Sequence, residues 1–247
     1  MADELQILKN RFNDLYERSR NRNIYCYSDF LNLHEQTILL SQFRFGYSLF
    51  GGYEYAERKI AVFGTENEMG YKPDPPLKII KASPLSQKFS DELTHRDFLG
   101  SLMGLGIKRE TLGDIIIADN CGYIICLENM AQFIIDNLLT IRRTSVSCEF
   151  CDTLPADALP KPQEKLIIVS SMRLDALISA VYNLSRTKSA ALVDGEKVFI
   201  NSKLSTSTSK PVEVGETVSV RGYGRFRCAE IRGDTRKGRV RILCEVY

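Results

Sequence analysis

The chain has 247 residues, of which 44% are hydrophobic, and 33 Lys and Arg nearly balance 31 Asp and Glu. This length can bury the core of one large domain or of two to three small ones, and no apolar run approaches the roughly 18 to 20 residues of a membrane helix. The start, Met1 to Glu4, is acidic where a signal peptide would be basic, and seven cysteines, an odd number, favour reduced thiols over a disulfide framework. We therefore expect a globular cytoplasmic protein without membrane contact.

The small net charge hides a division along the chain. Residues 1–160 carry 17 Lys and Arg against 22 Asp and Glu, a charge of −5, whereas residues 161–247 carry 16 against 9, a charge of +7. A basic section joined to a mildly acidic body is the layout expected when one module binds a polyanion. An uneven but solvated surface would give the same counts, so charge alone leaves both interpretations open.

In chain order, residues 1–58 are expected to form a helical N-terminal region. Leu5, Leu8, Phe12 and Leu15 recur at spacings of three and four, which predicts one apolar helix face. A second helix is expected to begin near Ser28 and Asp29, because both residue types cap helices well.

Residues 59–151 are expected to form an α+β sandwich with a ferredoxin-like, RNA-recognition-like order of elements. Thr94 followed by Asp97 predicts a capping box at the start of one helix, and a second helix is predicted from about Asn129 to Leu139. The expected strands are 60–63, 77–82, 115–118, 123–127 and 145–149, with a hairpin turn over 119–122. Residues 152–165 contain three prolines and predict a semi-rigid linker, so the fold class is α+β with a small domain over 166–247.

The small C-terminal domain contains the strongest signal. Leu174, Leu177, Ile178 and Val181 follow helical spacing, and strands are expected over 197–201 and 217–221. Ser185 is a good N-cap for a second helix, which places Arg186 and Lys188 in its first turn. Free backbone N–H groups and the helix dipole attract phosphate there, so two cations beside them predict an anion site.

The residues of this section resemble the S-four (alpha-L) RNA-binding domain over roughly residues 170–225. The ordered matches are Arg173-Leu174-Asp175, Leu177, Ser185-Arg186, Gly195-x-x-Val198, Asn201 and Val214-Gly215-Glu216. Glu216 departs from the Asp that is usual in the family. The resemblance implies an RNA-binding site whose candidate residues are Arg173, Ser185, Arg186, Lys188, Lys197, Arg221, Arg225 and Arg227. The alternative is that these side chains form only solvated helix ends and surface ion pairs.

The body of the chain is similar to the bacterial YlmH-type RNA-binding proteins. The matching motifs are Gly51-Gly52-Tyr53, Ala56-Glu57-Arg58, His95-Arg96-Asp97-Phe98-Leu99-Gly100, Leu105-Gly106-Ile107-Lys108-Arg109 and Gly113-Asp114-Ile115. The resemblance implies a non-catalytic, monomeric factor that binds the large ribosomal subunit at ribosomal RNA and tRNA, in the rescue of stalled translation.

The middle domain is not expected to bind RNA by stacking bases on its sheet, because the segment 114–118 has no aromatic residue and the segment 123–127 has only Tyr123. His95, Arg96, Lys108 and Arg109 flank one helix and are candidates for a secondary contact with phosphate or protein. They could equally hold the neighbouring loops in place.

No metal, cofactor or catalytic residue is expected. Cys148-x-x-Cys151 has no second ligand pair, and Gly222-x-Gly224 lacks the context of a dinucleotide loop. Two alternatives stay open: an RNA-modifying enzyme of the pseudouridine synthase or methyltransferase type, and a cell-division-associated adaptor.

Overall fold

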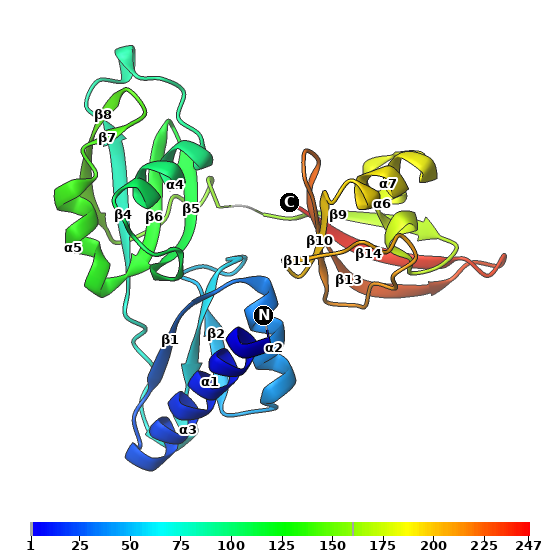
Figure 1. Ribbon diagram of the computed structural model, residues 1–247, viewed down its shortest axis with the longest axis horizontal. Coiled ribbons are helices and arrows are strands. Elements are labelled where there is room, and N and C mark those ends of the chain that lie inside the picture. The colour runs from blue at the N-terminus through cyan, green and yellow to red at the C-terminus, as the bar shows by residue number, and fades with distance from the viewer. Residues whose placement is uncertain (1, 160) are drawn as a thin grey trace. The chain divides into compact units, whose positions relative to one another are not determined.

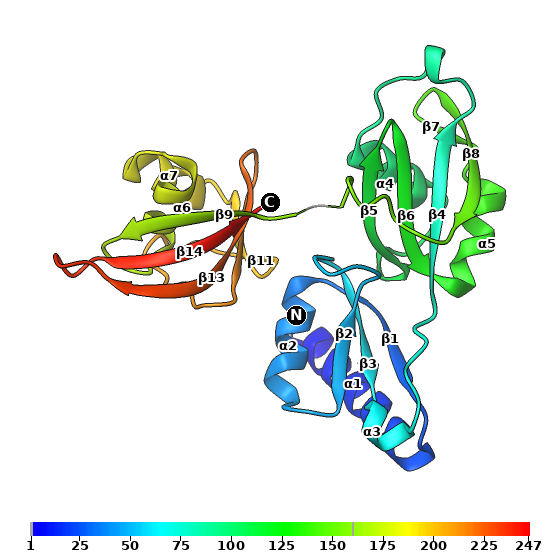
Figure 2. The same cartoon turned by 180° about the vertical axis from the view of Figure 1, so that it is seen from behind.

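The computed structural model describes residues 2–159 and 161–247, which fall into two compact units that separate after Leu159 (Figures 1 and 2). Each unit combines helices with an antiparallel sheet, which confirms the α+β class. None of the described helices is both long and apolar enough to span a lipid bilayer.

The N-terminal part of the first unit is a three-stranded sheet in the order β1-β3-β2 with helices on one face. Its elements are α1 (Ala2–Arg22), β1 (Cys26–Leu31), α2 (Leu33–Gln42), β2 (Tyr47–Phe50), β3 (Lys59–Phe63) and α3 (Glu66–Met69). The central strand β3 is apolar because both of its faces are buried. Ala61 and Phe63 pack with Phe12 of α1, whereas Ile60 and Val62 belong to a different core cluster.

The expectation of a helical region over residues 1–58 is correct for α1 and for a second helix, α2, but α2 begins later than expected and the strands β1 and β2 were not predicted. Ser28 and Asp29, interpreted as helix caps, lie inside β1. The buried Ser28 hydroxyl accepts a hydrogen bond from the backbone N–H of Ala61 at 2.8 Å, so it joins two strands. Asn32 is the residue that caps α2, and its side chain accepts from the backbone N–H of Glu35 at 3.0 Å.

β3 also corrects the expected domain boundary at residue 59. The sequence assigned this strand to the middle domain, but it pairs with β1 and β2. A run of apolar residues identifies a buried strand without identifying its partners, which accounts for the error.

The middle part of the first unit follows the order β-α-β-β-α-β, with one short extra strand. Its elements are β4 (Leu77–Pro84), the 3-10 turn η1 (Gln87–Phe89), α4 (His95–Gly104), the 3-10 turn η2 (Arg109–Thr111), β5 (Leu112–Ala118), β6 (Cys121–Leu127), α5 (Glu128–Asn137), β7 (Thr140–Ile141) and β8 (Thr144–Cys151). The sheet order is β5-β6-β4-β8-β7, a ferredoxin-like arrangement in which β4 and β6 are central.

The two faces of this middle sheet are covered by different elements. Helices α4 and α5 cover one face through Phe98 and Ile134. The opposite face packs Ile125 and Leu127 against Ile60 and Val62 of the N-terminal sheet. Much of the face that RNA-recognition sheets use for stacking is therefore buried inside this unit.

The second unit is a six-stranded sheet in the order β11-β10-β12-β13-β14-β9, with two helices on one face (Figures 1 and 2). Its elements are β9 (Gln163–Val169), α6 (Leu174–Tyr182), α7 (Arg186–Asp194), β10 (Val198–Ile200), β11 (Lys203–Leu204), β12 (Thr217–Val220), β13 (Gly224–Asp234) and β14 (Val240–Val246). β9 begins inside the expected 152–165 linker and pairs with β14 along its whole length, so the folded unit starts earlier than predicted.

We predict that Gly122→Ala destabilises the first unit by about 1 to 3 kcal/mol, the usual cost of overpacking a core. A Cβ at Gly122 on β6 would lie 2.1 Å from the Phe98 ring of α4. Thermal unfolding monitored by circular dichroism measures the effect. The matched control is Gly100→Ala on α4, the helix that carries Phe98, because a Cβ at Gly100 meets nothing within 4 Å. That change should be neutral or stabilise the helix by about 0.5 to 1 kcal/mol. Equal melting of both variants would contradict the packing described.

Candidate nucleic-acid interface

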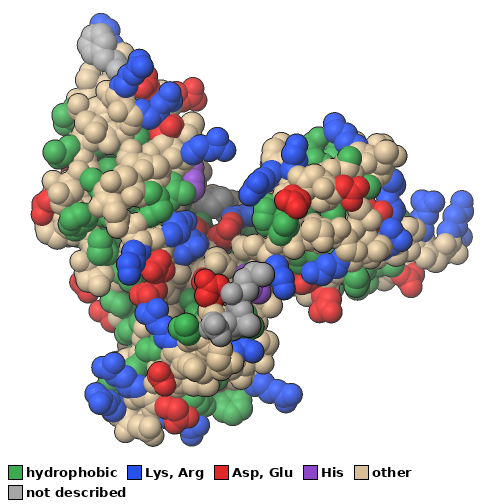
Figure 3. Space-filling model, viewed as in Figure 1, with side chains coloured by type: hydrophobic (Ala, Val, Ile, Leu, Met, Phe, Trp, Pro, Cys, Tyr) green, Lys and Arg blue, Asp and Glu red, His purple; other side chains and the backbone are tan. Residues whose placement is uncertain are grey.

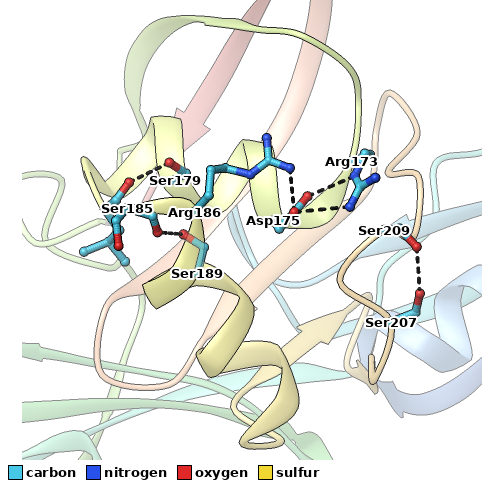
Figure 4. Close-up of polar contacts among 9 residues, drawn as sticks. Arg173, Asp175, Ser179, Ser185, Arg186, Ser189, Ser207 and Ser209 are labelled. Atoms are coloured by element: carbon cyan, nitrogen blue, oxygen red, sulfur yellow. Dashed lines mark hydrogen bonds and ion pairs between the residues drawn. The ribbon is translucent and has the colours of Figure 1, made fainter.

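A buried carboxylate joins the two helices of the second unit. The side chain of Asp175 in α6 is only 9% exposed, and it accepts hydrogen bonds from Arg173 and Arg186 (Figure 4). The Arg173 Nε to Oδ1 distance is 3.2 Å, and the Arg186 Nη2 to Oδ2 distance is 2.5 Å. The guanidinium groups approach from opposite sides, and both arginine side chains stay close to half exposed. We call these three residues the arginine clamp.

The chain around the clamp is fixed by its backbone hydrogen bonds. The N–H groups of Leu174 and Asp175 donate to the carbonyls of Lys210 and Thr208, so a second loop supports the first turn of α6. α6 buries its apolar stripe in the core and ends at Tyr182, and its C-cap Asn183 has a left-handed φ of 54°. The next helix begins at Arg186, three positions after Asn183, which places its first turn beside Asp175.

Ser185 caps α7 as the sequence predicts. Its hydroxyl oxygen accepts from the backbone N–H of Lys188 at 3.1 Å. The hydroxyl of Ser189 donates to the Ser185 carbonyl at 3.1 Å, and that of Ser179 donates to the Leu184 carbonyl at 2.5 Å. These bonds hold the α6–α7 turn, so Ser185 acts as a positioning residue for the cations of α7.

The electrostatic balance of the clamp favours an ionised carboxylate. Burial by itself raises the pKa of Asp175, but the hydrogen bonds and charges of Arg186 and Arg173 outweigh it, so the net pKa is lowered. Two guanidinium groups facing one carboxylate leave an excess of one positive charge and exposed N–H donors. Arg186 therefore has a role in folding as well as exposed N–H donors, because its removal would deprive a buried charge of a partner.

Lys188 lies on the same helical turn and contacts an aromatic pair. Its Nζ atom is 5.8 Å from the centroid of the Tyr223 ring, within the range of a cation–π interaction. Tyr223 in turn lies 5.5 Å from Tyr182, the last residue of α6. The Gly222-x-Gly224 segment is thus the turn that carries Tyr223 toward the helices.

The remaining candidates of this unit form a second group. The guanidinium of Arg221 lies 4.8 Å from the Phe199 ring, and that of Arg225 lies 4.6 Å from the Tyr247 ring. Arg227 pairs with Glu245 at 3.4 Å. In the strand register, Phe199, Arg225 and Arg227 alternate with core residues such as Val198 and Phe226, so they lie on the sheet face away from the helices. Lys197 is exposed just before β10.

The helical candidates of the middle domain separate into exposed and internal residues. His95, Arg96 and Lys108 are exposed. Arg109 turns inward, where its Nη1 donates to the carbonyls of Leu112 at 2.7 Å and Gly113 at 3.1 Å, and burial lowers its pKa to about 10. Arg109 therefore has the structural role that the sequence left open.

Sequence reasoning missed a neighbour of Arg109 that joins the two parts of the first unit. Arg58 donates from Nε to the Leu112 carbonyl at 2.9 Å and from Nη2 to the Phe30 carbonyl at 2.9 Å. Asp114 accepts from the Tyr53 hydroxyl at 2.7 Å in the same region, and burial raises its pKa. Arg58 and Asp114 both lie in the motifs quoted above, but sequence spacing does not show that they meet.

Cys148 and Cys151, the pair considered for a metal, lie three residues apart on β8. Each thiol donates to a backbone carbonyl, Cys148 to Leu138 at 3.4 Å and Cys151 to Thr153 at 2.9 Å. Across residues 2–159 and 161–247, no group of three or more His, Cys, Asp or Glu side chains could hold a metal ion.

Comparison with known proteins identifies the family. Residues 77–154 match a family described as "Putative RNA-binding domain in YlmH". The chain is also 33% identical over 225 residues to the Ribosome-associated protein quality control protein P2 of Bacillus subtilis, a match that covers 88% of this chain and 86% of the relative. The chain belongs to the YlmH family. A solved structure, the cell division protein ylmH from Streptococcus pneumoniae, shares 21% identity with a TM-score of 0.47, covering 60% of this chain and 91% of that one.

The YlmH family match coincides with the ferredoxin-like part of the first unit. That segment includes β4 and β6, whose outward positions would carry stacking aromatics in an RNA-recognition sheet. Here Ile125 is buried by the N-terminal sheet, and Tyr123 beside Lys81 is the aromatic that remains on the central strands.

For this YlmH-family protein we predict that Asp175→Asn destabilises the second unit by about 1 to 3 kcal/mol at neutral pH, because the half-exposed arginines lose their charged partner. Folding lowers the pKa of Asp175, so its ionised form stabilises the fold above the unfolded value of about 3.9 and this contribution is lost in more acidic solution. Urea unfolding at several pH values should therefore show the difference from wild type closing as pH falls.

The control for this prediction is Asp194→Asn, the same chemical change at an exposed position near the end of α7. It should leave stability nearly unchanged at every pH. A constant difference between Asp175→Asn and wild type down to acidic pH would show that the carboxylate charge is not what the arginines stabilise.

Proposed function

We propose that this protein is a non-catalytic RNA-binding factor that associates with the ribosome. Its second unit is an S-four RNA-binding module, and its targets are ribosomal RNA of the large subunit and adjacent tRNA during rescue of stalled translation. The observation that carries the proposal is the arginine clamp, a pair of half-exposed guanidinium groups fixed by one buried carboxylate. Membership of the YlmH family and the name of the B. subtilis relative support the ribosomal setting.

The clamp suits phosphate for a physical reason. Guanidinium groups bind phosphate oxygens through paired N–H donors, and their orientation is already restricted by Asp175, so less side-chain freedom is lost on binding. Lys188 adds a third cation on the first turn of α7. The charge of +7 on residues 161–247 attracts a polyanion over a longer range.

The same geometry argues against an enzyme that would use Asp175. A pseudouridine synthase needs a reactive aspartate in an Arg-Leu-Asp context, and the triplet at Arg173 is the candidate. Here both carboxylate oxygens accept from arginine and the residue is buried, which suits a structural anion. Arg221, Arg225 and Arg227 on the opposite sheet face, together with Lys197, are proposed as a further contact region.

We predict that RNA affinity resides in the second unit. Residues 161–247 should bind a labelled RNA hairpin with an A-form stem, and residues 1–159 should bind it far more weakly. The affinity of the basic fragment should fall steeply with salt, because each phosphate contact releases counterions. Each contact makes the slope of log binding constant against log salt concentration more negative by about 0.7 to 0.9. Fluorescence anisotropy titrations at several salt concentrations measure both. Affinity that is independent of salt, or that follows the first unit, would contradict the proposal.

We predict separate roles for two cations of α7. Lys188→Ala should weaken binding of the same RNA by about 1 kcal/mol with only a small change in melting temperature, because Lys188 is exposed and loses only a cation–π contact with Tyr223. Arg186→Ala should weaken it by about 1 to 3 kcal/mol and also lower the melting temperature, since Asp175 loses a partner. Arg186→Lys should recover only part of both losses.

Leu177→Ala is the control for indirect effects, because Leu177 is a fully buried apolar side chain that cannot itself contact a phosphate. It should destabilise the unit by roughly 2 to 5 kcal/mol and lose binding only in proportion to unfolding. Wild-type affinity in both Lys188→Ala and Arg186→Ala would place the phosphate site elsewhere.

A further inference from the structure

The hairpin formed by β13 and β14 extends past the helices of the second unit in both views (Figures 1 and 2). Its tip, residues 232–241, is built as a firm turn. The N–H of Thr235 donates to the Arg239 carbonyl at 2.7 Å, and the N–H of Arg239 donates to the Thr235 hydroxyl at 3.0 Å. Gly238 takes a φ of 68°, which permits the tight reversal.

A register irregularity of the β-bulge kind lies at the base of this tip. The register of the two strands shifts between Ile231 and Asp234, where Gly233 has a φ of 88°. Bulges increase local twist and redirect the strands beyond them. The regular pairing of the two strands is therefore interrupted at the base of the tip, and Asp234 pairs again with Val240 beyond it.

The tip concentrates positive charge. Residues 232–241 hold five cations, Arg232, Arg236, Lys237, Arg239 and Arg241, against the single acid Asp234, a net charge of +4. All five are exposed, and Lys and Arg side chains gather at the end of the hairpin in Figure 3. Arg232 pairs with Glu230 at 3.0 Å. In the described part of the chain, no ion pair joins the other four to an acidic side chain.

This concentration of like charge is unfavourable for the folded protein alone. Like charges close together repel, and the tip has little apolar surface with which to offset that cost. The cations come from both strands and from the turn between them. A ribbon with cations on both strands can pair all of them when it enters a groove that has anions on both sides. A flat acidic surface would contact only one side of the ribbon.

We propose that residues 232–241, the basic hairpin, form a second RNA-binding element that inserts between the two phosphate backbones flanking a groove of double-helical RNA. This inference rests on the proposed function. It adds a contact distinct from the arginine clamp in sequence and in secondary structure. The minor groove of A-form RNA is wide and shallow, so it is open to a protein ribbon, and the phosphates on its two sides supply the negative charge that the cations of the tip need.

The test is R236Q/K237Q/R239Q in the full-length protein, titrated with an RNA hairpin that has an A-form stem and, separately, with oligouridine. Loss of two or three phosphate contacts should weaken binding to the stem RNA at least tenfold and reduce the salt slope by about 2. The loss should be smaller on oligouridine, which has no groove. The melting temperature should stay unchanged, because the three side chains are exposed.

The matched control is R18Q/R22Q/K72Q, which removes the same residue types and the same charge from exposed positions of the first unit. It should change RNA affinity less than twofold. Equal losses in the two triple variants, or equal losses on stem RNA and oligouridine, would overturn the groove assignment. Unchanged RNA affinity with reduced co-sedimentation with ribosomes would overturn it in favour of an acidic protein partner.

Failure of this inference is distinguishable from failure of the proposed function. If Lys188→Ala weakens stem RNA binding and the hairpin variant does not, the clamp site stands and the hairpin inference fails. If the wild-type protein shows no salt-dependent RNA binding, the proposed function itself fails.

Discussion

The Asp175 carboxylate is the constraint on which the basic unit depends. A carboxylate removed from water needs compensating charge, and two arginines that are thirteen positions apart, Arg173 and Arg186, both turn toward it. Their attraction ties the start of α6 to the start of α7, while backbone hydrogen bonds tie α6 to the loop at Thr208. The interaction that positions the helices also orients the exposed N–H groups of both guanidinium groups, which under the proposed function would meet a phosphate. A phosphate would have to approach from the exposed half of each guanidinium, which limits the direction of binding.

The two units differ in which sheet faces are available. In the first, helices cover one face of the middle sheet and the N-terminal sheet covers much of the other, with Arg58 and Asp114 bonded across the contact. In the second, helices cover one face and the opposite face keeps arginines stacked on Phe199 and Tyr247. Open polar surface is thereby concentrated in the unit with the excess of positive charge. In the first unit, the exposed polar groups include helix ends such as the start of α4 at His95.

Local sequence patterns predicted the elements whose signals are local. The apolar stripe of α6, the Ser185 cap and the Thr94 capping box are all present. Ser28 misled the prediction because a hydroxyl that caps helices also bonds across strands. β9 was hidden beside a proline-rich segment, and the hairpin of β13 and β14 was missed because its charged tip lacks strict alternation. The Arg186 to Asp175 pair spans eleven residues, and helical spacing within either helix gives no sign of it.

The burial of the middle sheet beneath the N-terminal strands has a practical consequence. Ile125 and Leu127 are shielded by Phe30 and Ile60, which lie outside the segment 77–154 that matches the family. If that segment were excised, this apolar face would be opened to water, and exposed apolar faces of this kind drive self-association. The excised segment would also present Ile79 and Ile125 of the central strands as an accessible apolar platform, which the intact chain covers. Affinity for RNA seen with the shortened protein would then describe a surface created by the cut, and domain dissection here should keep residues 2–159 together.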